Sequence, residues 1–346
     1  MITWIFNYRR YRLPFRAVVR TGRGEWRERE GVVVRLEDAG GRVGYGEAAT
    51  MAWFGTETAD EVEAVCVAWG SRVDESQMRA LPARLGCLRH ALAAATVPSS
   101  RFEPRAAHLA MAGLLPAGRA ALAAAVPKAE AGFRVFKWKV GVGEIDEEMG
   151  LFDELCSAVP EGSKFRLDAN GAWDGRQAER WFKLCAERPV EWIEQPAFVP
   201  SDGTSAGGAL RQQADDLLMG LAEDYPTPVA LDESLVGEGD VDRWLAAGWP
   251  GVYVVKPSLF GDVAGVLSRL AKAKAAVCFS SAFETAIGAR SALQSAFAWP
   301  GEARALGFGA WPLFEDARCN GPSATPFLRW TDVERLNPEA VWTALS

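Results

Sequence analysis

Short apolar runs alternate with amphipathic stretches along most of the chain, from about residue 105 onward. The runs span residues 135–140, 164–169, 190–193, 228–231, 251–255 and 275–279. Most are followed by polar, Gly or Pro residues and then by a helical pattern, at 144–158, 175–186, 239–247 and 262–273. An alternation of short buried strands with helices is typical of a parallel sheet built from βα units. We therefore predict an α/β fold for this part of the chain.

The residues before this alternation have a different pattern. Alternating runs at 31–37 and 42–47 flank the turn sequence Asp38-Ala39-Gly40-Gly41, which favours a β-hairpin. Helical patterns follow at 59–73 and 81–95, and segment 97–104 collects Pro, Ser and charged residues, as linkers do. These elements predict a separate α+β lobe ahead of the parallel sheet.

Charged or polar residues stand at the ends of the predicted parallel strands. They are Lys139, Asp168, Glu194, Asp232, Lys256 and Ser280, each about one βα unit from the next. In a (β/α) barrel the carboxyl ends of all strands open on one face, where such barrels place their chemistry. We expect these side chains to meet in one site.

Strand parity adds candidates to that site, because residues two apart along a strand share a face. Lys137 shares the face of Lys139, while Arg166 and Asn170 share that of Asp168. These three additional residues are predicted to contact substrate.

Residues of the opposite parity should point away from the site. Leu167, Ile193 and Leu231 have this parity and are apolar, as contact with surrounding helices requires. Glu191 and Glu233 have it too, so we predict that they are packing or salt-bridge residues.

The composition excludes several classes of protein. It is that of a globular chain, with 49% hydrophobic and 24% charged residues. A net charge of −7 argues against a nucleic-acid partner, and glutamates interrupt the basic stretch 9–29, which favours a solvated segment. No run approaches the roughly 18 apolar residues of a membrane helix, and no signal peptide is evident, so we expect a cytoplasmic location. The six cysteines form no CxxC pair, which fits reduced thiols.

Asp168, Glu194 and Asp232 would repel one another if they shared one site. A divalent cation supplies the counter-charge that such a cluster needs in a low-dielectric interior. The chain has only two histidines, His90 and His108, in Ala- and Leu-rich contexts that favour packed or surface roles. An all-oxygen ligand set is therefore predicted, which favours Mg²⁺, with Mn²⁺ as the alternative.

Lys139 and Lys256 would flank this cation. A lysine close to a cation and a substrate carboxylate can serve as a base toward the adjacent carbon, and the cation holds the resulting enediolate. The predicted substrate is therefore a small-molecule carboxylate. Lys137 would either neutralise that carboxylate or lie in the barrel wall.

These motifs resemble those of the enolase superfamily, in its muconate-cycloisomerase subgroup. The segments that carry the resemblance are 136–141, 166–171, 192–196, 231–235 and 255–258, in consistent order between about residues 11 and 315. Segments 11–20, 44–48 and 166–170 are similar to the o-succinylbenzoate synthases of menaquinone biosynthesis.

The resemblance implies a modified (β/α)7β TIM-like barrel over residues 105–309. An α+β capping domain, residues 1–104 completed by the tail 310–346, would cover it. By analogy, Lys139 would remove the α-proton and then help hydroxide leave, while Lys256 would stabilise the enediolate by cation–π contact. The reaction would be syn dehydration of 2-succinyl-6-hydroxy-2,4-cyclohexadiene-1-carboxylate to 2-succinylbenzoate.

The resemblance also implies how the rest of the substrate is held. The positions that bind the distal succinyl carboxylate in the family correspond here to Ser280, Ser281 and the loop 306–309, which contains Gly307. The loops 21–27 and 51–55 would close over the substrate, with Trp53 and Phe54 as apolar walls.

One segment departs from the family pattern, and two other functions compete with the dehydration. Segment 198–224 is long and contains the Ser- and Gly-rich run 201–208, which predicts a surface insertion; if it reached the barrel mouth, the substrate would differ.

An N-acylamino-acid racemase or dipeptide epimerase would use Lys139 and Lys256 as paired acid and base. The alternative of another class is a non-catalytic metal-binding barrel.

Overall fold

The computed structural model describes residues 2–97, 102–200 and 204–345, and its first part is an antiparallel sheet in the order β3-β2-β1-β4. The strands are β1 (Thr3–Thr21), β2 (Gly24–Glu37), β3 (Val43–Ala48) and β4 (Arg72–Asp74). The predicted hairpin is confirmed as β2 and β3. In its turn, Asp38 Oδ1 accepts hydrogen bonds of 3.0 Å from the amides of Gly40 and Arg42.

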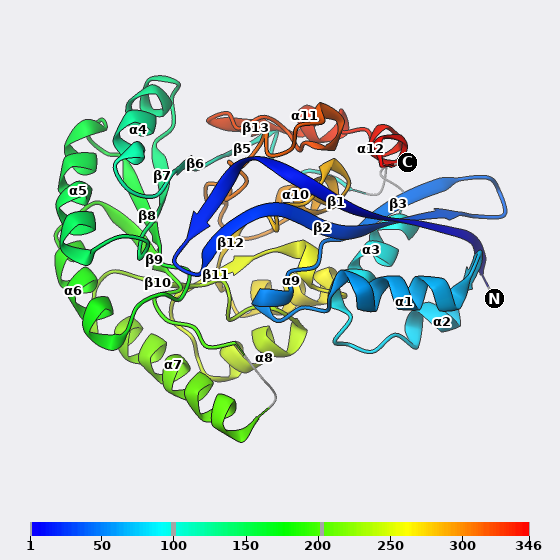
Figure 1. Cartoon of the computed structure of the whole chain (residues 1–346), viewed down its shortest axis with the longest axis horizontal. Coiled ribbons are helices and arrows are strands. Elements are labelled where there is room, and N and C mark those ends of the chain that lie inside the picture. Colours follow the sequence, from blue (N-terminus) through cyan, green and yellow to red (C-terminus); the bar gives the residue numbers. More distant parts are fainter. Residues whose placement is uncertain (1, 98–101, 201–203, 346) are drawn as a thin grey trace.

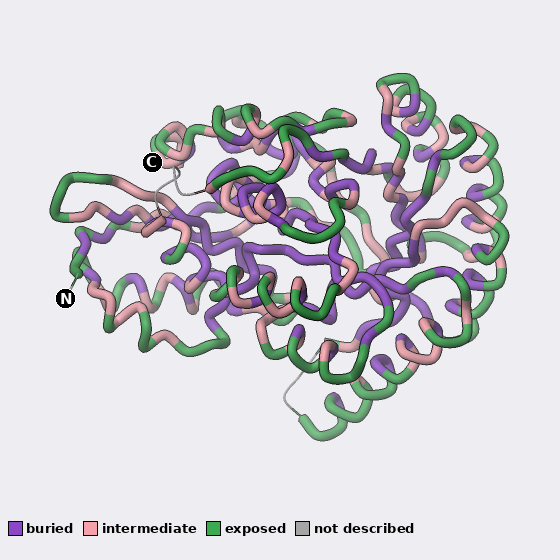
Figure 2. The backbone as a smooth tube through the Cα atoms, turned by 180° about the vertical axis from the view of Figure 1, so that it is seen from behind, coloured by how far each residue is buried: buried purple, intermediate pink, exposed green. Residues whose placement is uncertain are grey.

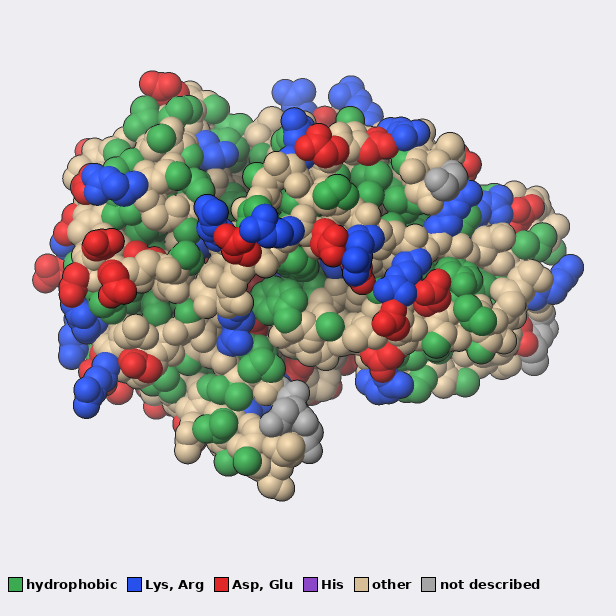
Figure 3. All heavy atoms as spheres, in the orientation of Figure 1, with side chains coloured by type: hydrophobic (Ala, Val, Ile, Leu, Met, Phe, Trp, Pro, Cys, Tyr) green, Lys and Arg blue, Asp and Glu red, His purple; other side chains and the backbone are tan. Residues whose placement is uncertain are grey.

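The basic stretch 9–29 is part of the long β1–β2 hairpin, drawn in dark blue in Figure 1, a strand pairing that the sequence did not predict. Most of its charged side chains are solvated, as expected: Arg12, Arg20 and Arg27 are all exposed. Its arginines pair with glutamates. Arg10 lies 3.4 Å from Glu30 and 2.9 Å from Glu63, and Arg20 lies 3.1 Å from Glu25. The glutamates that interrupt the basic stretch include partners on the neighbouring strand, a pairing that stabilises a hairpin. Figure 3 shows acidic and basic side chains interspersed over the face that it draws.

Helices pack against this sheet. They are η1 (Ala52–Phe54), α1 (Ala59–Trp69), α2 (Glu75–Arg79) and α3 (Gly86–Thr96). Helix α3 lies so close to β3 that a Cβ on Gly44 would be 1.9 Å from the Ala95 carbonyl oxygen, and one on Gly46 1.8 Å from that of Ala91. Only glycine permits such an approach. The two predicted helices exist, but one ends earlier, before Gly70, and the other begins later.

The second sheet is parallel, in the order β12-β11-β10-β9-β8-β7-β6. Its strands are β6 (Gly113–Leu115), β7 (Val135–Lys139), β8 (Lys164–Asp168), β9 (Val190–Glu194), β10 (Val229–Leu231), β11 (Val252–Val255) and β12 (Ala276–Phe279). All six apolar runs recognised in the sequence coincide with strands. Figure 1 shows α4 (Ala120–Glu130), α5 (Ile145–Ala158), α6 (Gly175–Cys185), α7 (Ser205–Asp224) and α8 (Glu238–Ala246) along the outside of the sheet. The remaining helices of this part are α9 (Val263–Lys272), α10 (Ala286–Phe297) and the short η3 (Pro257–Leu259) after β11.

A short segment beyond α10 joins the two ends of this sheet. Gly307 forms a parallel bridge with Ser280, directly after β12. Its neighbour Leu306 forms a parallel bridge with Met111, just before β6. The segment is therefore hydrogen-bonded on both sides.

The predicted alternation of faces is confirmed. Leu167, Ile193 and Leu231 are fully buried in the larger hydrophobic cluster, together with residues of the surrounding helices. The other face of the sheet carries a separate cluster of Trp192, Ala230, Val252, Val254 and Cys278. Figure 2 shows buried backbone running through the centre of the molecule. All six cysteines, each within the described ranges, are free thiols, as predicted.

Segment 198–224 is not a surface insertion, so that prediction was wrong. Most of it is α7, the helix that connects β9 to β10. The Thr204 side chain accepts a 3.0 Å hydrogen bond from the Gly207 amide at its start, and Leu218 and Leu221 are buried. The Ser- and Gly-rich start suggested a loop, although apolar residues at helical spacing follow it. Residues 201–203 of the run lie outside the described residues, as do 98–101 of the predicted linker.

The C-terminal residues return to the first sheet. Their elements are η4 (Ala317–Cys319), β13 (Phe327–Arg329), α11 (Trp330–Glu334) and α12 (Pro338–Ala344), and β13 pairs with β5 (His108–Ala110). Tyr45 of β3 donates a hydrogen bond to Glu339, and the Arg9 guanidinium lies 4.1 Å from the centroid of Trp342. No helix in the described ranges is long and apolar enough to cross a membrane.

Candidate active site

A cavity of about 630 Å³, which includes space open to solvent, lies where the carboxyl ends of the parallel strands face the first sheet. The strand ends and the loops that follow them contribute Lys137, Lys139, Asp168, Asn170, Asp232, Lys256, Ser280 and Ser281 to its lining. The opposite wall includes Thr21, Trp26, Met51, Trp53 and Phe54, and Gly307 also lines the cavity. The structure therefore brings most of the candidate residues together.

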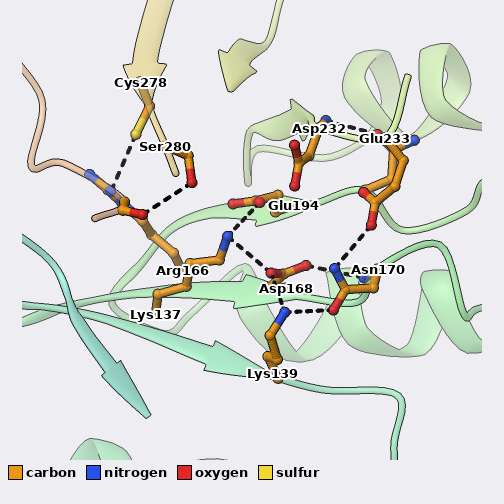
Figure 4. Close-up of polar contacts among 12 residues, drawn as sticks. Lys137, Lys139, Arg166, Asp168, Asn170, Glu194, Asp232, Glu233, Cys278 and Ser280 are labelled. Atoms are coloured by element: carbon orange, nitrogen blue, oxygen red, sulfur yellow. Dashed lines mark hydrogen bonds and ion pairs between the residues drawn. The ribbon is translucent and has the colours of Figure 1, made fainter. Parts of the chain in front are cut away.

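Two lysines of β7 share one carboxylate (Figure 4). Lys139 Nζ donates to Asp168 Oδ2 at 3.1 Å and to Asn170 Oδ1 at 2.8 Å. Lys137 Nζ lies 3.0 Å from Asp168 Oδ2 and donates to Glu194 Oε1 at 2.5 Å. Lys137 thus bridges carboxylates from two neighbouring strands, while Lys139 contacts the Asp168 carboxylate and the side-chain amide of Asn170.

Lys256 enters the cavity from the end of β11. Its ammonium forms a short ion pair with Asp232 and lies 4.7 Å from the ring centroid of Phe54. Burial raises the pKa of Asp232, and Lys256 opposes this shift. Because Phe54 belongs to η1, a ring from the first part of the chain packs directly on a lysine of the second.

The pKa values of the carboxylates at the ends of β8 and β9 are shifted in opposite directions. Burial alone would raise the pKa of Asp168, but the positive charges of Lys137 and Lys139 hold it below its ordinary value. Burial raises the pKa of Glu194 to about 7; the Lys137 charge opposes the shift, and the neighbouring carboxylate of Asp168 adds to it. Both side chains are about 1% exposed, so little solvent screens these effects. A further positive charge would favour the ionised form of Glu194.

The chemistry of these donors fits a divalent cation. Asp168, Glu194 and Asp232 are buried carboxylates on adjacent strand ends, and oxygen ligands are those that Mg²⁺ prefers. As the side chains now stand, however, no group of three or more Asp, Glu, His or Cys residues in 2–97, 102–200 and 204–345 is spaced to hold a metal ion. Lys137 instead supplies the counter-charge, and it would have to turn away from Asp168 and Glu194 to admit an ion.

Two polar residues that the sequence did not assign to the site hold these strand ends in place. Gln195, at a left-handed φ of 41°, accepts hydrogen bonds from the amides of Asp232 (2.8 Å) and Ser234 (3.1 Å). Glu233 Oε1 accepts a 3.0 Å bond from Asn170 Nδ2. Glu233 was predicted to point away from the site, but β10 ends at Leu231, so strand alternation no longer applies to it.

Arg166 does not line the cavity. Its guanidinium pairs with Glu191 at 2.8 Å, donates to the Ala305 carbonyl at 2.6 Å and lies 3.9 Å from the ring centroid of Trp192. It has the parity of Asp168 but precedes it by two residues, which places it about 6.6 Å deeper along the strand. The predicted salt-bridge role of Glu191 is thus confirmed, whereas a substrate contact by Arg166 gains no support.

The serines after β12 have different hydrogen-bond partners. Ser280 Oγ donates to the Gly307 carbonyl at 3.2 Å. Ser281 Oγ donates to the buried Glu284 at 2.6 Å and accepts from the Phe283 amide at 2.8 Å. Phe283, at a left-handed φ of 58°, turns its side chain into the cavity lining. Its strained backbone gave no signal in the sequence, although such outliers cluster at functional sites.

Aromatic rings form the wall opposite the lysines. Trp26 packs edge-to-face on Trp53 at 5.7 Å and on Phe283 at 5.4 Å, and Trp53 packs on Phe54 at 4.6 Å between ring centroids. Trp53 and Phe54 were predicted walls, whereas Trp26 was part of a predicted closing loop only. The cavity thus has one charged and one apolar side, which suits a ring that carries carboxylates.

Comparison with known proteins agrees with this geometry. Residues 119–325 match the family described as enolase C-terminal domain-like, and residues 5–97 match the N-terminal domain of MenC. The o-succinylbenzoate synthase of Thermosynechococcus vestitus is 36% identical over 309 residues, which cover 88% of this chain and 92% of that protein. That of Klebsiella pneumoniae is 28% identical, over 81% of this chain and 82% of that protein.

Solved structures give the same result. The Thermosynechococcus elongatus o-succinylbenzoate synthase, complexed with Mg in its active site, superposes with a TM-score of 0.78 at 33% identity, over 98% of this chain and 99% of that one. The Bacillus subtilis L-Ala-D/L-Glu epimerase shares the fold, with a TM-score of 0.77 at 19% identity over 94% and 95% of the two chains. Since one relative is 36% identical over 88% of this chain and 92% of its own length, the chain belongs to the o-succinylbenzoate synthase family of the enolase superfamily.

Proposed function

We propose that the chain dehydrates 2-succinyl-6-hydroxy-2,4-cyclohexadiene-1-carboxylate to 2-succinylbenzoate, the reaction for which its relatives are named. The observation that carries the proposal is that Lys139 and Lys256, on strands separated by three others, reach one cavity that also holds buried carboxylates. Its charged side suits the substrate's carboxylates and its aromatic side suits the ring.

Lys139 is proposed as the acid and base. As a neutral amine it would take the proton from the ring carbon that bears the carboxylate, and the electron pair of that bond would delocalise into the carboxylate as an enediolate. The C–O bond at the neighbouring carbon would then break. The ammonium of Lys139 would return the proton to the departing hydroxide, so that water and an aromatic ring result. Asp168 and Asn170 would hold its Nζ in place throughout.

Lys256 is proposed to stabilise the anion without exchanging a proton. Its ammonium is fixed by Asp232 and already lies over one aromatic face, that of Phe54. A substrate ring that entered next to Phe54 would meet the same cation, and cation–π attraction is strongest where water is excluded.

Asp168, Glu194 and Asp232 are proposed to bind Mg²⁺, with Mn²⁺ as a possible substitute. When bound, the cation would supply positive charge to the substrate carboxylate and to its enediolate. Ser280, Ser281 and Gly307 remain proposed contacts of the distal carboxylate. In the structure the Ser281 hydroxyl donates to Glu284 and its backbone amide donates to the Gly307 carbonyl at 3.3 Å, so a contact with the carboxylate would replace one of these bonds.

We also infer the architecture around the site. The bridges of Leu306 and Gly307 to both ends of the parallel sheet support a closed (β/α)7β barrel. The division into a capping domain, 1–104 with the tail 310–346, and a barrel domain, 105–309, is supported by the separate family matches at 5–97 and 119–325. The cytoplasmic location stays a prediction.

The test is a direct assay with Mg²⁺, in which aromatisation is followed by ultraviolet absorbance. Lys139→Ala should abolish turnover, and Lys139→Arg should do so too, because a guanidinium keeps the charge but does not exchange a proton. Lys183→Ala is the matched control, since Lys183 is exposed on α6 and its ammonium lies 3.4 Å from the Glu179 carboxylate. Full activity in either Lys139 variant would refute the assignment.

Racemisation or epimerisation remains the second candidate, because both lysines reach the cavity as a paired acid and base would. Incubation with N-succinyl amino acids in deuterated water separates the two functions. The dehydration proposal expects slow α-proton exchange. Rapid exchange that depends on both Lys139 and Lys256 would favour the racemase.

A further inference from the structure

The tip of the β1–β2 hairpin is inserted between the loops that follow β7 and β8. A Cβ on Gly22 would lie 2.5 Å from the Ala172 Cβ and 3.0 Å from the Gly141 carbonyl oxygen, so only glycine fits there. Thr21 and Trp26, on either side of the tip, line the cavity. The tip therefore closes one side of the cavity by direct contact with the strand-end loops.

Arg23, in this tip, is anchored to backbone carbonyls of the loops that follow β8 and β9. Its Nε donates to the Asn170 carbonyl at 2.8 Å, and its Nη2 donates to the carbonyls of Phe198 at 2.5 Å and Gly171 at 3.5 Å. The guanidinium carbon lies 4.9 Å from the centroid of the Phe198 ring. A Cβ on Gly171 would lie 2.7 Å from Arg23 Nη2, so the loop leaves room for this side chain.

Asn170 connects this anchor to the proposed base. Its backbone has a left-handed φ of 46°, a conformation that is strained for a non-glycine residue and needs support from its surroundings. Its side chain accepts from Lys139 Nζ at 2.8 Å and donates to Glu233 at 3.0 Å. Asn170 therefore binds Arg23 through its backbone carbonyl and Lys139 through its side-chain amide oxygen.

We propose that Arg23 is a positioning residue, which aligns Lys139 through Asn170 when the hairpin tip covers the cavity. The inference rests on the proposed role of Lys139 as the base. Arg23 does not touch Lys139 itself. By fixing the Asn170 backbone it would increase the fraction of molecules in which Lys139 Nζ has the reactive orientation, and such alignment acts on kcat more than on KM.

Arg23→Gln tests the inference, because glutamine keeps a polar side chain but cannot reach all the carbonyls. We expect kcat to fall at least about tenfold with KM changed less than about threefold, since a misplaced catalytic group costs far more rate than binding. Arg23→Lys should recover only part of the loss. Arg12→Gln is the matched control, because Arg12 lies on the same hairpin, is exposed and pairs with Glu28 and Glu30 of the neighbouring strand. A change in KM alone, or equal losses in the Arg23 and Arg12 variants, would overturn the inference.

A second measurement separates this inference from the proposed function. Amide hydrogen exchange over residues 168–173 requires no substrate, and the Gly171 amide there donates to the Gln195 carbonyl at 2.7 Å. Exchange should quicken severalfold in Arg23→Gln but not in Arg12→Gln. If the unmodified protein failed to turn over the cyclohexadiene, the proposed function would fail and this result would still decide whether Arg23 fixes the loop. Unchanged exchange would overturn the inference whatever the activity.

Discussion

Glu47 is a buried carboxylate that ties β3 to the first turn of α10. It is 0% exposed and accepts hydrogen bonds from Tyr11 Oη at 2.6 Å, from the Thr285 amide at 2.9 Å and from the Gly288 amide at 2.9 Å, as well as from the Thr285 hydroxyl. Glu47→Ala would leave these buried donors without an acceptor. At about 1 kcal/mol or more for each unsatisfied donor, the free energy of unfolding should fall by roughly 4 kcal/mol.

Urea unfolding followed by tryptophan fluorescence and by circular dichroism measures this loss. Glu37→Ala is the matched control on the same sheet, since Glu37 forms a partly exposed ion pair with Arg35 at 3.0 Å, and such pairs contribute about 0.5 kcal/mol. A loss below about 1 kcal/mol in Glu47→Ala would refute the reasoning, because it would mean that water satisfies the donors as well as the carboxylate does.

The pH dependence of the Glu47→Gln variant checks the charge separately. Burial raises the pKa of Glu47, and the hydrogen bonds from Thr285 and Tyr11 oppose the shift without cancelling it. The folded protein therefore binds this proton more tightly than the unfolded chain, so stability from this group is present below about pH 4.3 and is lost as pH rises through the raised pKa. As pH rises above about 4.3, the ordinary pKa of a glutamate, the unmodified protein should lose stability relative to Glu47→Gln. The opposite slope would show that the hydrogen bonds outweigh burial.

Further predictions concern the proposed metal site and the residues that support it. Removal of divalent cations with EDTA should abolish turnover, and Mg²⁺ or Mn²⁺ should restore it; activity that is indifferent to chelation would rule out the three-carboxylate site. Glu148 accepts hydrogen bonds from the amides of Gly141, Val142 and Gly143 at 2.7, 3.0 and 2.9 Å. Glu148→Ala should therefore lower the free energy of unfolding, measured by urea titration, by about 3 kcal/mol. A loss under about 1 kcal/mol would contradict this. Phe54→Leu should lower kcat by about tenfold, since a desolvated cation–π contact is worth about 1–2 kcal/mol, and an unchanged kcat would argue against a role for Phe54 beside Lys256.

The positions of the parallel strands could be predicted from the sequence because each strand is a short apolar run followed by a helical pattern. The candidate site followed from the same pattern, since polar residues such as Lys139, Asp168 and Lys256 stand where these runs end. β1 was not predicted, because arginines such as Arg9, Arg10 and Arg12 interrupt its apolar residues and break a regular alternation. The pairing that stabilises it is with β2, the other arm of the hairpin.

The contacts that support the site could not be predicted, because they depend on which loops meet. Gln195 binds the amides of Asp232 and Ser234, which follow a different strand, and no local pattern marks such a side chain. Parity also fails where a strand stops, as it does before Glu233. Strand parity gives the face on which a side chain lies but not its position along the strand. Arg166 therefore shares a face with Asp168 without reaching the cavity.

The walls of the cavity come from both sheets, so contacts between them should affect chemistry as well as stability. Phe54 and Arg23 belong to the first part of the chain, yet one packs on Lys256 and the other holds the loop that orients Lys139. Glu47 binds the amide of Thr285, which precedes α10 and lies four residues after Ser281. A variant that loosened the first sheet would therefore lose the alignment of both lysines before the parallel sheet unfolded. Loss of activity at denaturant concentrations below the main unfolding transition is the expected sign of this coupling, and coincident loss of activity and structure would contradict it.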